Sequence, residues 1–218
     1  MSEGIVAING NGIQTLELFF ILTVLMLLPS IIVMMTSFVR IVIVLSFTRS
    51  ALGTQQTPPN TVLIGIALFL TLFIMSPVLD QVNEQAYIPY KNEEITQEEA
   101  LERAAVPMRK FMIDQTEDSA LQMYLDLAKE PMPENIDELP LRVVIPAFMT
   151  SELKQAFIMG FLLFIPFLLI DIVVSSILMS MGMIMLPPAT IAMPFKLLLF
   201  VTVDGWQLLF STLVKSFI

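Results

Sequence analysis

Long apolar runs separated by short polar stretches dominate this chain. The runs cover residues 16–35, 38–47, 61–79, 156–186 and 191–218. The first holds 20 residues, enough to cross a hydrocarbon core of about 30 Å, and Pro29 predicts a kink within it. The second continues the first, although Arg40 interrupts its apolar character. The pattern therefore predicts a protein built on membrane helices.

A polar stretch between the apolar runs predicts a solvated helical domain. Residues 80–142 carry 15 acidic and 6 basic side chains, a net charge of −9 that equals the net charge of the whole chain. Within this stretch, Thr96 and Glu99 fit a capping box that opens a helix, and apolar positions in 119–128 recur at helical spacing. An acidic surface repels phosphates, so we expect no nucleic acid partner.

These patterns predict an all-α integral membrane protein with two kinked helical hairpins and a small acidic extramembrane domain. We divide the chain into an N-terminal segment (1–15), a first apolar hairpin (16–79), an acidic helical domain (80–145) and a second apolar hairpin (146–218) with a Met-rich loop at 179–188. The run Thr57-Pro58-Pro59-Asn60 marks entry into a helix. No signal sequence is visible in the first 15 residues.

Two arginines predict the orientation of this arrangement in the membrane. Arg40 and Arg49 flank the linker within the first hairpin. The positive-inside rule then places this linker on the cytoplasmic side, and the acidic domain and both termini outside.

Composition agrees with a membrane protein and narrows its chemistry. Apolar residues make up 56% of the chain, and the mean hydropathy is +0.81. Cysteine and histidine are absent, which excludes disulfides, zinc sites built on these residues and catalysis by a histidine base. The sequence also has no P-loop. We therefore expect no enzymatic activity, no cofactor and no metal.

A methionine-rich stretch interrupts the second hairpin. Methionine recurs at 179, 181, 183 and 185, a period of two that forms no single stripe on a helix. Gly182 and the prolines at 187 and 188 break the helix around it. Methionine side chains are flexible and polarisable, so the stretch suits an apolar surface that deforms and reseals. A Met-rich turn packed in a core is the alternative interpretation.

Charged residues inside the second hairpin are candidates for function. Asp171 and Lys196 lie at equal distances from a turn at 183–184, so we expect them level on facing helices and joined by an ion pair, because unpaired charges at membrane depth are costly. A proton or ion relay through Asp171 is the alternative. Asp204, before Gly205, is a further candidate or the cap of a helix break.

Two other features have structural explanations. Ser151 followed by Glu152 is typical of a helix N-cap with an acid in the first turn, rather than of a catalytic carboxylate. Phe157, Phe161 and Phe164 follow at near-helical spacing and indicate packing, unless they line a pore in an oligomer.

Several sequence blocks resemble the FliP family, the flagellar members of the FliP/SctR subunits of type III secretion export gates. These blocks are RSALGTQQTPPN at 49–60, PMRKFMIDQT at 107–116, PAFMTSELKQAF at 146–157, MGMIMLPP at 181–188 and PFKLLLFVTVDGW at 194–206. The resemblance covers about residues 16–218, and the wording at 53–56 favours the flagellar branch.

The resemblance implies a pore subunit in the bacterial inner membrane, at the flagellar basal body. It implies that about five copies assemble with FliQ and FliR, and also with FlhB and FlhA, around a path for unfolded flagellar proteins. Met183, Ile184 and Met185 would form a gasket, Phe164 would line the pore, and Asp171 with Lys196 would be a family ion pair. The assembled gate would lie largely outside the bilayer plane.

Two features depart from the family pattern, and two other functions compete with it. Members often have three consecutive methionines where this chain has Met-Ile-Met, and isoleucine is stiffer. Many begin with a cleavable signal sequence. A small secondary transporter that uses Asp171 as a proton relay is the alternative. An intramembrane protease would need an unusual pairing of Asp171 with Asp204.

Overall fold

The computed structural model describes residues 6–8, 11–13, 18–19, 22–23, 26–27, 30, 33–54, 56–131, 133, 139–183 and 185–218. Much of the predicted first apolar run, including the kink at Pro29, therefore lies outside the described residues. Two short strands near the N-terminus, β1 (Val6–Ile8) and β2 (Asn11–Ile13), pair antiparallel with Val6 opposite Ile13. The sequence patterns did not predict this pair.

The first hairpin consists of α2 (Phe38–Ala51) and α3 (Asn60–Val82). Helix α3 begins directly after Pro59, as the proline-rich entry signal predicts. It continues through η1 (Asn83–Tyr87) and α4 (Ile88–Lys91), giving 32 helical residues in a row. The boundary predicted between residues 79 and 80 therefore falls inside a helix.

The acidic stretch forms two amphipathic helices. Helix α5 (Gln97–Asp114) opens with the predicted capping box, in which the Thr96 side chain accepts from the Glu99 backbone and the Glu99 side chain accepts from the Thr96 backbone. Helix α6 (Asp118–Ala128) follows after a short turn. Both helices therefore match the positions that capping and apolar spacing predict.

The second hairpin is built on one long helix. Helix α7 (Leu141–Ser180) has 40 residues, about 60 Å at 1.5 Å per residue, so it is about twice as long as a hydrocarbon core is thick. It begins five residues before the predicted boundary at 146, because Pro140 ends the preceding loop. Helices α8 (Pro188–Thr202) and α9 (Gly205–Lys215) return alongside it and bend by 64° relative to each other.

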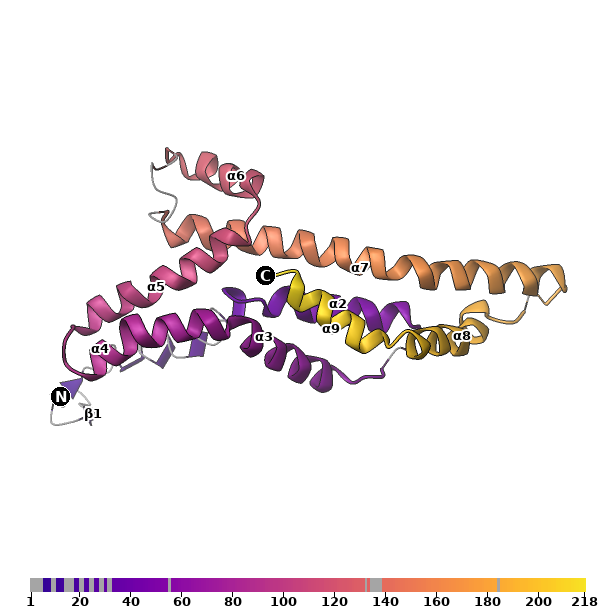
Figure 1. The fold of residues 1–218 in the computed structure, drawn as a ribbon, viewed down its shortest axis with the longest axis horizontal. Helices are drawn as coiled ribbons and strands as arrows, with labels where there is room; N and C mark the ends of the chain where they lie inside the picture. The colour runs from indigo at the N-terminus through magenta and orange to yellow at the C-terminus, as the bar shows by residue number, and fades with distance from the viewer. Residues whose placement is uncertain are drawn as a thin grey trace, which may run out of the picture.

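The helices form an elongated bundle with α7 along most of its length, and α4 and part of α5 extend beyond the start of α7 (Figure 1). At one end of α7 the chain turns back into α8, and at the opposite end α5 and α6 pack against its first turns (Figure 1). Short helix α2 lies within the bundle, and its buried Ile41, Val44 and Leu45 join a cluster with side chains of α3, α7 and α9. A second apolar cluster joins α3, α5, α6 and α7.

Long apolar helices confirm the all-α membrane class. In the described part of the chain, two helices, 60–91 and 141–180, are long and apolar enough to cross a membrane, and the bent pair α8–α9 would make a third. Helix α2, with 14 residues, is about 21 Å long and too short to cross alone. Of the predicted apolar runs, residues 38–47 form part of α2 inside the bundle, and much of residues 16–35 lies outside the described residues.

Candidate functional site at the second hairpin and its polar core

The turn between α7 and α8 ends the long helix with a glycine in the left-handed region. Gly182 has φ +74°, its N–H donates to the Met179 carbonyl at 3.0 Å, and the Met183 N–H donates to the Leu178 carbonyl at 3.0 Å. This is the Schellman arrangement, which satisfies the last carbonyls of a helix. Gly182 therefore ends α7 by adopting a left-handed conformation that other residues rarely adopt. The sequence predicted only that a glycine would interrupt the helix.

The methionines around this turn project from the bundle. Met179, Met181, Met183 and Met185 are all exposed, and Met185 is 99% exposed. Of the three predicted gasket residues, Met183 and Met185 lie at the tip of the hairpin, whereas Ile184 falls outside the described residues. The exposure within this single chain does not fit a Met-rich turn packed in its own core.

The structure brings Asp171 and Lys196 together across the hairpin. The Lys196 ammonium donates to Asp171 Oδ2 at 2.6 Å and to the Ala51 carbonyl at 3.2 Å. Lys196 is 5% exposed, and Asp171 Oδ1 has no hydrogen-bond partner among the described residues. The ammonium of Lys196 in α8 therefore contacts both α7 and the last turn of α2. The sequence did not indicate the contact with α2.

The phenylalanines of α7 divide into two groups. Phe157 and Phe164 contact the same ring, Phe47 of α2, edge-on at centroid distances of 5.3 and 6.2 Å. Phe161 is 67% exposed. Phe164, the residue expected to line a pore, is half-buried against α2 in the single chain.

Asp204 lies at the bend between α8 and α9. It adopts a left-handed conformation with φ +51°, and its side chain makes no capping hydrogen bond. Its backbone carbonyl accepts from the Leu208 N–H at 3.0 Å. Of the two interpretations left open by the sequence, Asp204 does occupy the N-cap position of α9, but its backbone and not its side chain makes the hydrogen bond there.

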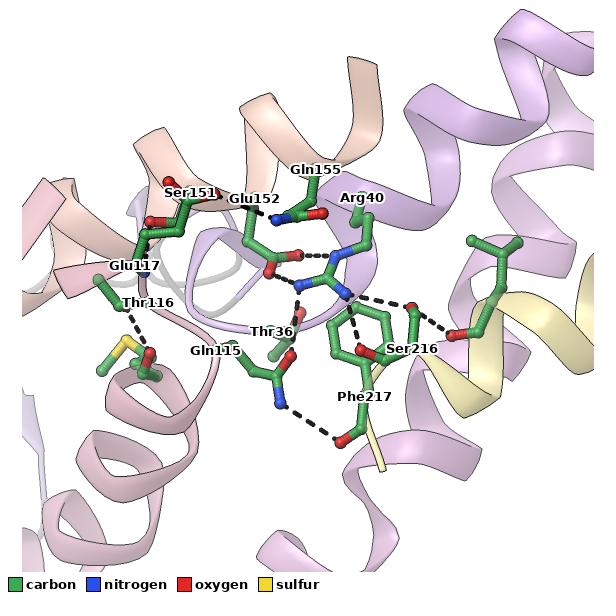
Figure 2. A network of polar contacts seen from close by, with 12 residues as sticks. Thr36, Arg40, Gln115, Thr116, Glu117, Ser151, Glu152, Gln155, Ser216 and Phe217 are labelled. Carbon is green, nitrogen blue, oxygen red and sulfur yellow. Dashed lines mark hydrogen bonds and ion pairs between the residues drawn. The ribbon is translucent and has the colours of Figure 1, made fainter. Parts of the chain in front are cut away.

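Glu152 is the clearest departure from the sequence-based interpretation. It lies in the interior of α7, beyond the first turn, because the helix begins at Leu141 and runs through Pro146. Its carboxylate is fully buried and forms an ion pair with Arg40 of α2 (Figure 2). Ser151 caps no helix either, since its hydroxyl donates to the Ala147 carbonyl at 3.0 Å.

The Arg40 guanidinium uses five N–H donors in this network. Nε donates to Glu152 Oε2 at 3.0 Å, and one terminal nitrogen donates to Glu152 Oε1 and, at 3.3 Å, to Gln115 Oε1. The other terminal nitrogen donates to the carbonyl and the hydroxyl of Ser216, both at 3.1 Å. The guanidinium also lies 3.8 Å above the centre of the Phe217 ring. Five is the full donor capacity of arginine.

The turn between α5 and α6 contacts the same network. The Gln115 amide nitrogen donates to the Phe217 carbonyl at 3.3 Å. Two residues on, the Glu117 N–H donates to the Ser151 hydroxyl at 3.0 Å, and the Glu117 carboxylate accepts from Lys154 at 2.5 Å and from Gln155 at 3.1 Å. Hydrogen bonding to Lys154 and its positive charge hold the pKa of the Glu117 carboxyl below its ordinary value of 4.5.

Sequence reasoning missed the Arg40–Glu152 pair, although a signal for it was present. Arg40 interrupts an apolar run, and Glu152 is one of three acids in residues 146–218. A charge among apolar helices needs a partner. The pairing also weakens the predicted orientation, because Arg40 is 3% exposed inside the bundle and does not lie in a solvated linker.

Exposed apolar helices, a Met-rich hairpin tip and ion pairs between helices define a helical membrane protein. The described residues hold no group of three or more Asp, Glu, His or Cys placed for a metal. The model of the FliP family matches residues 21–213. The chain belongs to the FliP family.

Relatives from distant bacteria agree with this assignment. The flagellar biosynthetic protein FliP of Pectobacterium carotovorum subsp. carotovorum is 55% identical over 206 residues, covering 94% of this chain and 79% of the relative. The proteins of the same name from Bacillus subtilis (strain 168) and Aquifex aeolicus (strain VF5) are each 50% identical, over 207 and 211 residues. These matches cover 95% and 96% of this chain, and 94% and 88% of the relatives. The shared name and the membrane helices support a membrane-associated component of flagellar biosynthesis and export.

Proposed function

We propose that this chain is a pore-forming subunit of the flagellar protein export gate in the bacterial cytoplasmic membrane, at the flagellar basal body. In this proposal about five copies form a closed ring by a repeated head-to-tail contact. FliQ and FliR complete the assembly, FlhB and FlhA adjoin it, and unfolded flagellar proteins pass through transiently.

The observation that carries the proposal is the exposed methionine tip of the α7–α8 hairpin. Met183 and Met185 lie at the end of a long helix, beyond the apolar clusters that hold the bundle together. Repeated around a ring, such tips would bring flexible apolar side chains together at a constriction. An empty constriction of this kind excludes water and ions by dewetting. It presents no fixed hydrogen-bonding groups to a passing polypeptide, and methionine adapts to varied side chains.

The Asp171–Lys196 pair would hold this tip in place. It joins α7 and α8 below the turn and reaches α2 through the Ala51 carbonyl. Because Lys196 already neutralises Asp171, a proton relay through Asp171 would have to break this contact. The pairing therefore favours a structural role for Asp171 over the transporter alternative.

Native mass after co-expression with FliQ and FliR tests the assembly. The chain weighs 24.5 kDa, and we expect a discrete complex near five copies plus partners when it is extracted in mild detergent. A monomer or dimer that ignores both partners would contradict the proposal, because no ring of tips forms from so few copies.

A further inference from the structure

We propose that the turn at residues 115–117 is a polar clasp that fixes one orientation of helices α5 and α6 against α7, with Arg40 as its anchor. The clasp consists of Gln115 and Glu117 on the turn and their partners Arg40, Ser151, Lys154, Gln155 and Phe217. This inference concerns the single chain and does not depend on assembly around a pore.

The apolar contacts between α5, α6 and the rest of the bundle hold these two helices in place but do not by themselves fix one orientation. Phe111, Met112, Leu121 and Leu125 are buried against α7 and α3, and such burial is favourable but non-directional. Hydrogen bonds require defined distances and angles. Outside the turn, the Tyr124 and Thr150 hydroxyls form a hydrogen bond of 3.1 Å between α6 and α7. The larger set of directional contacts at this interface belongs to the turn.

Arg40 gives the clasp a fixed foundation. Glu152 of α7 holds the guanidinium with two bonds, which leaves its remaining donors aimed at Gln115 and Ser216 (Figure 2). Gln115 then bridges Arg40 and the Phe217 carbonyl, so the turn contacts α2 and the residues after α9 together. A planar, fully bonded guanidinium suits this role, because its donors keep fixed relative directions.

Two spin labels measure the orientation directly. The chain has no cysteine, so Met123→Cys on α6 and Leu153→Cys on α7 create unique labelling sites, and both positions are more than 40% exposed. Pulsed electron resonance on the full chain in detergent then gives the distribution of distances between the two helices. We expect one narrow distribution for the parent protein.

Gln115→Met tests the clasp without touching the ion pair. It removes the bonds to Arg40 and Phe217 and keeps a similar side-chain volume. We expect the distribution to broaden by about twofold, because the turn then keeps only the contacts of Glu117 and is no longer bonded to its anchor. Gln122→Met on the exposed face of α6 is the matched control and should leave the distribution narrow. An unchanged width in Gln115→Met would overturn the proposal.

A second variant separates orientation from folding. Arg40→Met combined with Glu152→Leu replaces the buried pair with apolar side chains, a change that often preserves stability. We expect normal helix content by circular dichroism together with a broad distance distribution. A narrow distribution in this folded variant would show that Arg40 does not anchor the clasp and would overturn the proposal. If the double variant does not fold, the Gln115→Met result decides.

Discussion

Two acidic side chains of helix α7 are neutralised within the chain, but to different degrees. Glu152 is fully buried, and both of its oxygens are bonded to Arg40. Asp171 is bonded through one oxygen, and its side chain is 34% exposed. Loss of one partner leaves the other charge unpaired, and this is costlier where solvent is excluded. The Arg40 pair therefore constrains the fold more tightly than the Lys196 pair, which lies below the hairpin tip.

Replacement of Asp171 and Lys196 separates a structural pair from a proton relay. Asp171→Leu alone leaves the buried Lys196 ammonium unpaired and should cost at most ~3 kcal/mol of folding free energy, reduced by the partial exposure of the pair. Asp171→Leu with Lys196→Met should recover part of the stability and part of the swimming motility. Motility that stays absent in a folded, assembled double variant would favour the relay.

The Glu117–Lys154 contact predicts a dependence on acid. Because the folded state lowers the pKa of Glu117, this contact stabilises the protein fully above pH 4.5 and is lost as the pH falls below that value through the lowered pKa. The difference in thermal unfolding midpoint between the parent protein and Lys154→Met should therefore be present at neutral pH and disappear in acid. A difference that persists unchanged in acid would contradict this role.

Sequence patterns predicted local contacts better than distant ones. The Asp171–Lys196 contact could be anticipated because a turn between them sets their register, and the α5 start because its capping box is four residues long. Arg40 and Glu152 are 112 residues apart, and no local pattern sets which helices meet. The prediction of a helix N-cap at Ser151 and Glu152 was wrong for a different reason. The pair Ser-Glu also occurs in helix interiors, and the sequence does not show that the helix begins earlier, at Leu141.

Close approach of α2 and α7 depends on a glycine. A Cβ on Gly160 would lie 2.6 Å from the Cγ and 3.0 Å from the Cβ of Phe47. Phe47 also contacts Phe157 and Phe164, so its ring has little room to move. The contact between these helices, which positions α7 along its length, therefore requires the smallest side chain at residue 160.

Gly160→Ala should destabilise the protein by about 1–3 kcal/mol through overpacking against Phe47. Gly65→Ala in α3 is the matched control, because nothing lies within 4 Å of its added Cβ and alanine favours a helix by about 0.5–1 kcal/mol. Unfolding midpoints in detergent measure both changes. Equal midpoints for the two variants would show that α2 and α7 separate without cost.

Helix α7 connects the two ends of the molecule. The clasp contacts it near Ser151 and Lys154, and the ion pair at Asp171 and the methionine tip lie further along the same helix. The side chains of Phe161, Leu168 and Leu169 on this helix are each more than half exposed. In the proposed gate, lipid and neighbouring subunits would cover this apolar surface of α7.

Ion leak through the assembled gate tests the central claim most directly. Met183→Ala with Met185→Ala should raise ion conductance across membranes that contain the complex, because smaller side chains leave a constriction that no longer dewets. Met123→Ala on α6 should leave the conductance at the parent value, since this methionine lies far from the hairpin tip along the chain. An unchanged conductance in the tip variant, with the complex intact by native mass, would contradict the gasket.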